Sequence, residues 1–218
     1  MFVLGLGHKA RHGKNWAAKA IIQHCAKQGL YAREFGFADA LRAYCRVLGM
    51  REKDPLLLQV VGTNVFRRLD PDIWVRIGLD TVKEANPDVA VFTDCRFLNE
   101  VEGIRSLGGV MVKVSRLNAD GTPWVASDRP ADHPSEIALD TYDGWDAVIA
   151  VESGKTEELS AKAIDVFEGL RAQEADLRAA NEPDPPCEHC GQPSVMITDR
   201  LPVEYICNEC FVAIYEAR

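Results

Sequence analysis

The chain has 218 residues, of which 47% are hydrophobic and 27% charged, and its net charge is −8. This composition is typical of a globular protein with an ample core, in one domain of ordinary size plus a small appendage. The acidic balance argues against broad electrostatic binding to duplex nucleic acid, which needs clustered Lys and Arg. No stretch approaches the length of a transmembrane span, and charges begin at His8-Lys9, so we expect a cytoplasmic protein with no membrane partner.

The opening stretch predicts a strand, a basic loop and a helix. Residues 1–6 are apolar, and an alanine-rich pattern to about Gln28 predicts a helix that Gly29 ends. In this order they form a phosphate-binding P-loop, where backbone N–H groups surround a polyphosphate and a lysine reaches its outer phosphates. Lys14 is therefore a candidate catalytic residue, although a lysine at a helix start can be simply solvated. The candidate nucleotide-binding loop comprises Lys9, Ala10, Arg11, His12, Gly13, Lys14, Asn15 and Trp16.

Two positions of this loop depart from the usual pattern G-x-x-x-x-G-K-[ST]. His8 stands at the first glycine, which narrows the backbone choices unless Gly7 takes over the turn. Asn15 stands at the Ser/Thr position that normally holds magnesium. Either Asp94 and water hold the magnesium alone, or the activity is weakened or altered.

The rest of the chain alternates strands and helices, which predicts an α/β fold with a mostly parallel sheet flanked by helices on both faces. Asp54-Pro55 and Asp70-Pro71 are both helix start signals, with the second helix reaching about residue 85. A loop or lid is expected over 116–134, with Ser135 as the cap of the helix after it. Further strands are expected over 31–37, 89–93, 110–115 and 147–151, and further helices over 38–49, 99–107 and 156–180.

Asp94 and Arg96 follow the buried strand over 89–93, at the end where open α/β sheets place their ligands. A carboxylate there can hold magnesium as a Walker-B-type aspartate does, and Arg96 can grip a phosphate through two parallel hydrogen bonds. A salt-bridged pair at a strand end is the structural alternative. Several arginines around one site are expected for phosphoryl transfer, although any single one is more often a surface residue. The candidates are Arg67, Arg68, Arg116 and Arg129.

The seven cysteines form two groups. Cys25, Cys45 and Cys95 stand singly in apolar surroundings and are expected to be core residues in a reducing compartment. The others form the pattern Cys187-x2-Cys190, then sixteen residues, then Cys207-x2-Cys210. Four thiolates in two pairs at this separation predict a structural zinc ribbon, with two disulfides as the less fitting alternative. We therefore expect domains over 1–180 and 187–218, joined by a proline-rich linker over 181–186.

Taken together, several segments resemble the phage deoxynucleoside monophosphate kinase family of the P-loop kinase superfamily. They keep their order and spacing across about residues 1–150, whereas the zinc ribbon lies outside the resemblance. The family loop usually reads Gly-Lys-Asp-Thr or Gly-Lys-Asp-Ser, and Asn15-Trp16 offers neither the carboxylate nor the hydroxyl. The matching segments are Lys9-Ala10-Arg11-His12-Gly13-Lys14-Asn15, Leu58-Gln59-Val60-Val61-Gly62-Thr63-Asn64 with Arg67, Asp72-Ile73-Trp74-Val75, Thr93-Asp94-Cys95-Arg96-Phe97-Leu98-Asn99-Glu100, Gly108-Gly109 and His133-Pro134-Ser135-Glu136.

The resemblance implies transfer of the γ-phosphoryl group of ATP, with Mg²⁺, to a deoxynucleoside monophosphate on a P-loop kinase-like fold. In that case Lys14, Asp94, Arg96 and Arg67 are the catalytic residues, and a phage-encoded chain would work in the host cytoplasm. Residues expected to bind the acceptor are Asp39, Gln59, Arg67, Arg68, Arg116, Arg129 and Glu136.

Two other functions stay open from the sequence. One is a P-loop kinase that acts on a modified base in DNA through the ribbon, which the acidic balance disfavours. The other is a non-catalytic nucleotide-binding scaffold, which the Asn15-Trp16 departure favours. The sequence does not indicate which base is accepted, and a homodimer built on the long helix and the ribbon is also left open.

Overall fold

The computed structural model describes residues 1–52, 54–127, 130–181, 187, 190, 195–197 and 204–211. Contacts divide the chain into two compact units, Met1–Arg171 and Ala172–Arg218. The candidate Arg129 lies outside the described residues, as does the predicted linker apart from Asn181. The expected domain boundaries at 180 and 187 stay a prediction.

The first unit is built on a five-stranded sheet with the strand order β2-β3-β1-β4-β5, in which all neighbouring strands are parallel. This arrangement confirms the predicted α/β fold. The central strands read as continuous apolar runs because both faces of the sheet are covered. The strands are β1 (Phe2–Gly7), β2 (Ala32–Phe35), β3 (Val89–Cys95), β4 (Val110–Leu117) and β5 (Ala147–Glu152).

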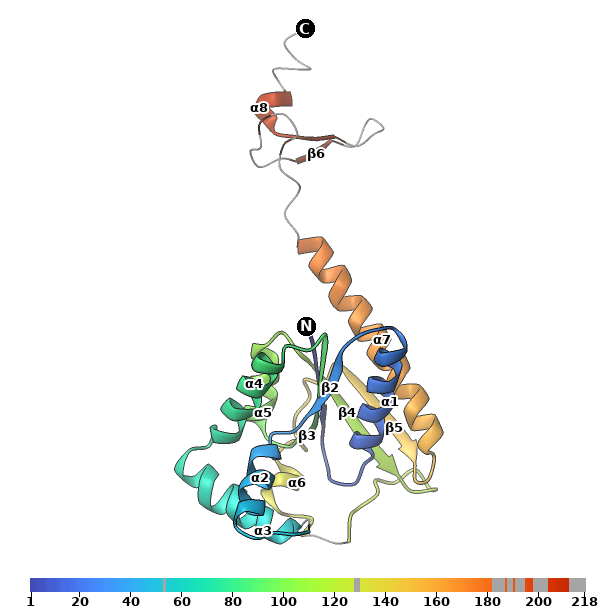
Figure 1. Cartoon of the computed structure of the whole chain (residues 1–218). Coiled ribbons are helices and arrows are strands. Elements are labelled where there is room, and N and C mark those ends of the chain that lie inside the picture. The colour runs from blue at the N-terminus through green and yellow to red at the C-terminus, as the bar shows by residue number, and fades with distance from the viewer. Residues whose placement is uncertain are drawn as a thin grey trace. The chain divides into compact units, whose positions relative to one another are not determined.

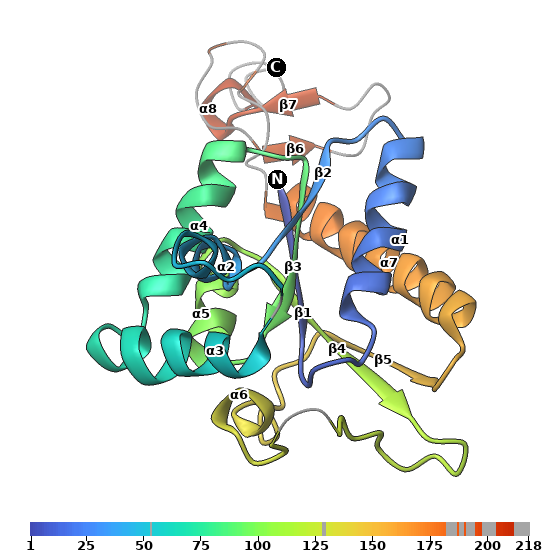
Figure 2. The same ribbon diagram turned by 60° about the horizontal axis from the view of Figure 1, so that its bottom comes forward.

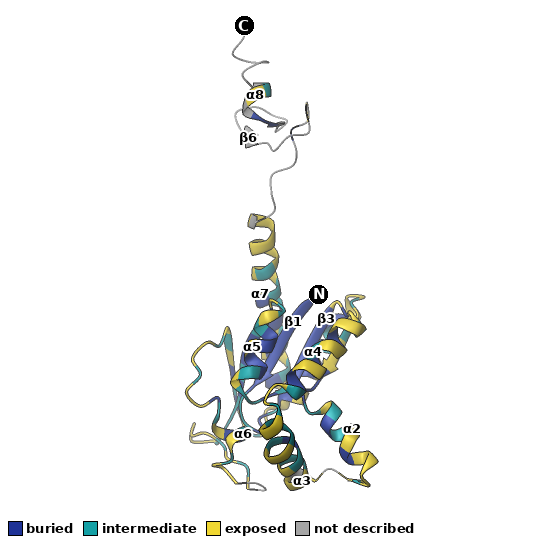
Figure 3. Ribbon diagram, turned by 90° about the vertical axis from the view of Figure 1, so that its left-hand side faces the viewer, coloured by how far each residue is buried: buried dark blue, intermediate teal, exposed yellow. Residues whose placement is uncertain are grey.

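Helices pack on both faces of the sheet and give it two separate apolar clusters (Figure 1). On one face lie α1 (Lys14–Lys27) and α7 (Thr156–Asn181), where the rings of Phe2 and Phe167 meet edge to face with centroids 5.6 Å apart. On the other lie α2 (Asp39–Val47), α4 (Ile73–Ala85) and α5 (Leu98–Ser106), over the stacked rings of Phe37 and Phe92. The central strands β1 and β3 are buried along almost their whole length (Figure 3), whereas the edge strands β2 and β5 are only partly buried.

Asp54-Pro55 and Asp70-Pro71 have the same sequence pattern but form different structures. Asp54 caps α3 (Pro55–Gln59), because its carboxylate accepts the N–H of Leu57 at 3.0 Å. The helix predicted after Asp70-Pro71 is present as α4 and ends at Ala85 as expected, but its predicted start is wrong, since α4 begins only at Ile73. The Asp70 carboxylate instead accepts the N–H of Asp72 at 3.1 Å and pairs with Arg76 at 2.6 Å.

Between α3 and α4 the chain forms a π-helix, η1 (Val60–Arg67), which no sequence pattern indicated. A π-helix has wider turns than an α-helix, is rare, and is frequently found at functional sites. Its last residue is the candidate Arg67.

The predicted 116–134 loop is shorter than expected. β4 continues to Leu117, so Arg116 lies in a strand. The short helix α6 (Pro134–Ile137) follows the loop and lies near the carboxyl ends of the strands (Figure 2). The prediction of Ser135 as its cap is wrong, because His133 is the cap and its Nδ1 accepts the N–H of Ser135 at 3.2 Å.

The described part of the second unit contains a small antiparallel pair of strands, β6 (Val195–Ile197) and β7 (Glu204–Ile206), and a short helix, α8 (Asn208–Phe211). Its buried cluster comprises Cys187, Ile206 and Cys207. Among the described residues of the whole chain, no helix is long and apolar enough to cross a membrane.

Candidate active site

The loop between β1 and α1 follows the central strand of the sheet, at the edge where open α/β sheets bind ligands. Gly13 has a φ of 95°, and this left-handed conformation at the start of α1 suits glycine. His8, at the position of the first motif glycine, has a φ of 88°. Gly7 therefore does not take over the turn, and a histidine carries a backbone conformation that costs about 1–2 kcal/mol for a side chain with a Cβ atom.

Lys14 lies beneath this loop, with only 4% of its surface exposed. Its ammonium group donates hydrogen bonds to the carbonyl oxygens of His8, at 3.2 Å, and Lys9. It is therefore not a solvated surface lysine. Burial, followed by the positive charge of Arg96, lowers the pKa of Lys14 to about 7. A bound anion favours the charged form of such a lysine, so the site is suited to phosphate.

Asp94 is held by the turn after β2. Its carboxylate accepts the N–H groups of Phe37 at 2.8 Å and Ala38 at 3.1 Å, and it lies 3.7 Å from the Arg42 guanidinium. A Cβ atom at Gly36 would lie only 2.8 Å from an Asp94 oxygen, so the turn passes the carboxylate too closely for a larger residue. Asp94 is thus fixed by backbone donors.

The candidate Asp39 lies in the same turn. Its carboxylate accepts the N–H of Gly36 at 2.8 Å and pairs with Arg42. The structure therefore brings Asp39 and Asp94 to one arginine, at the carboxyl end of the sheet.

Asn15 points toward a carboxylate that the sequence analysis did not single out. Its side-chain amide donates to Glu34 Oε1 at 3.1 Å, and the Thr93 hydroxyl donates to the same oxygen at 2.9 Å. Asn15 therefore holds Glu34, at the position where the usual motif places a hydroxyl.

His12 connects the loop with the end of β4 and the segment after it through two hydrogen bonds. Its Nδ1 accepts the N–H of Arg116 at 3.1 Å, so its Nε2 carries the proton and donates to the Trp124 carbonyl at 3.1 Å. Burial lowers the pKa of His12 to about 4, in agreement with a neutral ring. The Arg116 guanidinium lies 4.1 Å from the centre of the Trp124 ring.

A cavity of about 430 Å³ lies beside His12, between the loop and the turn after β5. Its size suits a small ligand. From the candidate residues it gathers Arg11, His12, Gly13, Asn15, Trp16 and Arg116, and it is completed by residues 151–156 and Leu159.

Arg96 and Arg67 each pair with a buried glutamate. The Arg96 guanidinium is paired with Glu136 of α6, whose other oxygen accepts the N–H of Ala10 at 3.0 Å. Arg67 is paired with Glu100 of α5. Burial raises the pKa of Glu100 to about 7, against the opposing effect of Arg67.

The side chains of four other predicted residues lie outside the pairs of Arg96 and Arg67. Lys9 pairs with Asp140 at 2.8 Å. Gln59 is half-buried at the end of α3 and Arg68 is exposed after η1, and within the described part of the chain neither makes a side-chain hydrogen bond or ion pair. Trp16 is 57% exposed at the cavity.

The sequence analysis missed several residues that the structure places here. Glu100 was noted only within a matching segment, and Glu34, Trp124 and the 151–156 turn were not noted at all. Glu34 and the turn lie at the carboxyl ends of β2 and β5, and that position was the one available signal.

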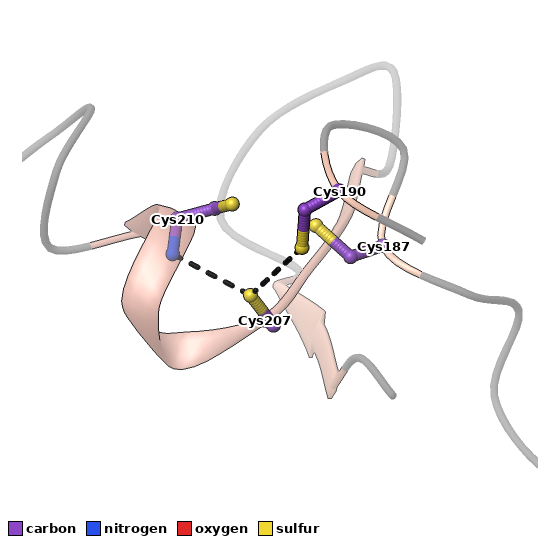
Figure 4. A group of neighbouring side chains, drawn as sticks. All are labelled: Cys187, Cys190, Cys207 and Cys210. Atoms are coloured by element: carbon purple, nitrogen blue, oxygen red, sulfur yellow. Dashed lines mark hydrogen bonds between the residues drawn. The ribbon is translucent and has the colours of Figure 1, made fainter. Parts of the chain in front are cut away.

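The four C-terminal cysteines converge, with their sulfur atoms all within 4.8 Å of one another (Figure 4). None of the four forms a disulfide within the described part of the chain, so the disulfide alternative is not observed. Four sulfurs about 2.3 Å from one zinc ion lie just under 4 Å apart, so the spacing fits tetrahedral zinc. This cluster fits a zinc ribbon, as predicted. Cys25, Cys45 and Cys95 are buried, also as predicted.

A buried strand, a glycine-lysine loop and a helix on a parallel sheet of this order define a P-loop kinase-like α/β protein. No family model matches the chain. It is 27% identical to a protein of Acanthamoeba polyphaga mimivirus named "Putative deoxynucleotide monophosphate kinase", over 75% of this chain and 95% of that one. It is 34% identical to the deoxynucleoside-5'-monophosphate kinase of Escherichia phage T5, over 38% of this chain and 33% of that one. Among solved structures, the shikimate kinase of Acinetobacter baumannii overlaps 78% of this chain and 94% of its own, with a TM-score of 0.49 and 13% identity.

Proposed function

We propose that the chain transfers the γ-phosphoryl group of ATP to a deoxynucleoside 5′-monophosphate and so forms the diphosphate. The names of the two viral relatives support this reaction. The observation that carries it is Lys14, buried beneath a loop at the carboxyl end of a parallel sheet, within the electrostatic reach of Arg96. Phosphoryl transfer needs positioning and neutralisation of charge more than covalent chemistry, and these residues supply both.

The donor nucleotide would occupy the loop and the cavity beside it. Its phosphates would meet the backbone N–H groups before α1 and the ammonium of Lys14. Its nucleoside would enter the cavity between Arg11, Arg116 and the 151–156 turn, with Trp16 at its edge. The acceptor phosphate would bind on the other side, at Arg67 and Arg96.

Magnesium is implied by this reaction, and oxygen ligands are what it prefers. Asp94 and Glu34 supply carboxylates on the strand ends beside the loop, so the residues present fit the ion. When bound, magnesium would neutralise charge on the transferring phosphates. Asn15 would act on the site through Glu34, to which its amide is hydrogen-bonded at 3.1 Å. Zinc would occupy the four cysteines as a structural ion.

The proposal is tested by ADP release with each of the four deoxynucleoside monophosphates, with hydroxymethylated analogues and with DNA as acceptors. We expect turnover with at least one monophosphate, and its loss in Lys14→Ala. Lys27→Ala is the matched control, because Lys27 is an exposed lysine at the far end of the same helix.

One alternative has support from the structure, namely a nucleotide-binding scaffold without transfer. It is favoured by Asn15, which offers no hydroxyl for magnesium and is engaged with Glu34. ATP binding that no acceptor converts into ADP release would establish the scaffold and contradict the kinase. A homodimer and a nucleic-acid contact through the ribbon stay predictions.

A further inference from the structure

Two buried glutamates link the phosphate loop to the π-helix through two arginines. At the loop, the N–H of Ala10 donates to Glu136, and the other oxygen of Glu136 is paired with the Arg96 side chain. The backbone N–H of Arg96 donates to Glu100 Oε2 at 2.6 Å, and Glu100 Oε1 is paired with Arg67. Two ion pairs and two backbone hydrogen bonds thus connect the loop after β1 with the last residue of η1.

The glutamates hold the arginines in fixed orientations. Glu136 is 7% exposed and Glu100 is 2% exposed, and buried charge pairs are weakly screened by water. Glu100 also accepts the N–H of Phe97 at 3.1 Å, and the Arg67 guanidinium lies 4.3 Å from the centre of the Phe97 ring. Arg67 is therefore held both by its partner carboxylate and by the face of an aromatic ring.

Both arginines keep hydrogen-bond donors for a ligand. A guanidinium has five N–H groups in a planar fork. Among the described residues, Arg96 donates from Nη1, to Glu136 and the Ser135 carbonyl, and Arg67 donates from Nη2 to Glu100 and from Nη1 to the Pro71 carbonyl at 3.4 Å. The remaining N–H groups match the geometry of a phosphate, which guanidinium groups bind through parallel hydrogen bonds.

We propose that Glu100 and Glu136 are positioning residues, which hold Arg67 and Arg96 to receive the acceptor phosphate opposite the nucleotide loop. Neither glutamate needs to touch the substrate, since each acts through its arginine. This inference rests on the proposed function, because it assigns the two arginines to the acceptor.

The first test is Glu100→Gln. The amide oxygen of glutamine can still accept the N–H groups of Arg96 and Phe97, whereas its NH2 group would face the Arg67 guanidinium. We expect the KM for the deoxynucleoside monophosphate to rise about 10- to 100-fold, the range of one hydrogen bond to a charged group. The affinity for ADP, measured by calorimetry, should change less than about twofold. Glu102→Gln is the matched control, because Glu102 is an exposed glutamate of the same helix.

A double-variant cycle separates positioning from a structural role. If Glu100 acts through Arg67, then Arg67→Ala combined with Glu100→Gln should raise the acceptor KM no further than Arg67→Ala alone. Additive effects, or an unchanged KM in Glu100→Gln, would overturn the inference. So would a parallel fall in ADP affinity and melting temperature.

Glu136→Gln gives a second measurement if Glu100→Gln fails to fold. It should raise the acceptor KM through Arg96, because the NH2 group of glutamine would face the guanidinium. The affinity for ADP should change little, because the amide oxygen can still accept the N–H of Ala10 in the loop. Asp132→Asn, an exposed acid in the preceding loop, is its control. An unchanged acceptor KM in Glu136→Gln would overturn the role of Glu136. Absence of transfer by the wild-type chain would overturn the proposed function and the inference with it. Transfer by the wild-type chain, with an acceptor KM that is unchanged in both glutamate variants, would overturn the inference alone.

Discussion

Each of the two units of the chain is stabilised internally by different means. The first has two apolar clusters on the faces of a sheet, and its candidate site is an arrangement of N–H donors and cations suited to anions. In the described part of the second, the buried cluster consists of Cys187, Ile206 and Cys207, and its candidate site consists of thiols suited to a soft cation. A large core fixes binding groups by packing, whereas a small segment needs its ligand in order to fold.

Removal of metal should give the largest difference between the units. Structural zinc supplies an apparent folding free energy on the order of 10–16 kcal/mol in small zinc domains. We therefore expect a strong chelator to unfold the second unit while the first keeps its thermal transition. Zinc content by mass spectrometry and amide NMR spectra of the whole chain measure both. Loss of the first unit's transition on chelation would contradict the comparison.

A core substitution should produce the opposite pattern. Phe167 is fully buried against Phe2, and truncation of a buried phenylalanine to alanine costs about 3–5 kcal/mol. Phe167→Ala should lower the free energy of unfolding of the first unit by that amount, while the zinc content stays one ion per chain. Val148→Ala, at an exposed strand position, should change the stability by less than about 0.5 kcal/mol. Zinc loss in Phe167→Ala would show that the second unit depends on the first.

Lys14→Met should separate function from stability within the first unit. Loss of one positioned donor lowers a transfer rate by about 10²–10³-fold, or 2.7–4 kcal/mol. The stability of the folded chain should rise in Lys14→Met, although the transfer rate falls. Because the folded-state pKa of Lys14 is lowered to about 7, the unfolded chain binds the proton more tightly, and burial of the charge is unfavourable at and below that pH.

The gain in melting temperature of Lys14→Met should therefore be greatest near pH 7 and below, and should shrink as the pH rises toward 10.5. Scanning calorimetry of the variant and the wild-type chain at several pH values measures how this gain depends on pH. A melting temperature below that of the wild-type chain at pH 7 would show that the hydrogen bonds of Lys14 to the loop outweigh the burial of its charge.

The smallest effect should come from His12. Its pKa is lowered to about 4, so the unfolded chain takes up a proton below pH 6.5 that the folded chain resists. Stability from the neutral ring is present above pH 6.5 and is lost as the pH falls toward 4. His12→Gln should flatten this part of the stability curve in urea unfolding at pH 7, 6 and 5. Parallel curves for the variant and the wild-type chain would contradict this assignment.

Local patterns were enough to predict the sheet and the cluster of four cysteines. Residues 89–93 form a continuous apolar run because β3 is buried on both faces, and the cysteine spacing reflects two short ligand pairs. Local patterns failed where one signal fits two structures. Asp54-Pro55 and Asp70-Pro71 are equivalent in sequence, but the second carboxylate has Arg76 within reach and closes a turn instead of capping a helix.

Contacts between distant residues could not be predicted from one sequence. Glu100 looks like an ordinary first-turn acid of a helix, and its partner Arg67 lies 33 residues away, at the end of a π-helix. The tie between His12 and Trp124 spans 112 residues. In each case the fold brings the partners together, and neither residue type alone indicates the pairing.

The pairing of Arg67 and Arg96 with glutamates also bears on how fast a nucleotide would be captured. Two cations matched by two buried anions produce little field at a distance, and the chain as a whole carries a charge of −8. These two arginines would therefore add little long-range attraction for a polyphosphate approaching from solution. We expect its association rate to stay near values typical of unsteered binding and not to fall as the ionic strength is raised, in contrast to sites with unpaired cations.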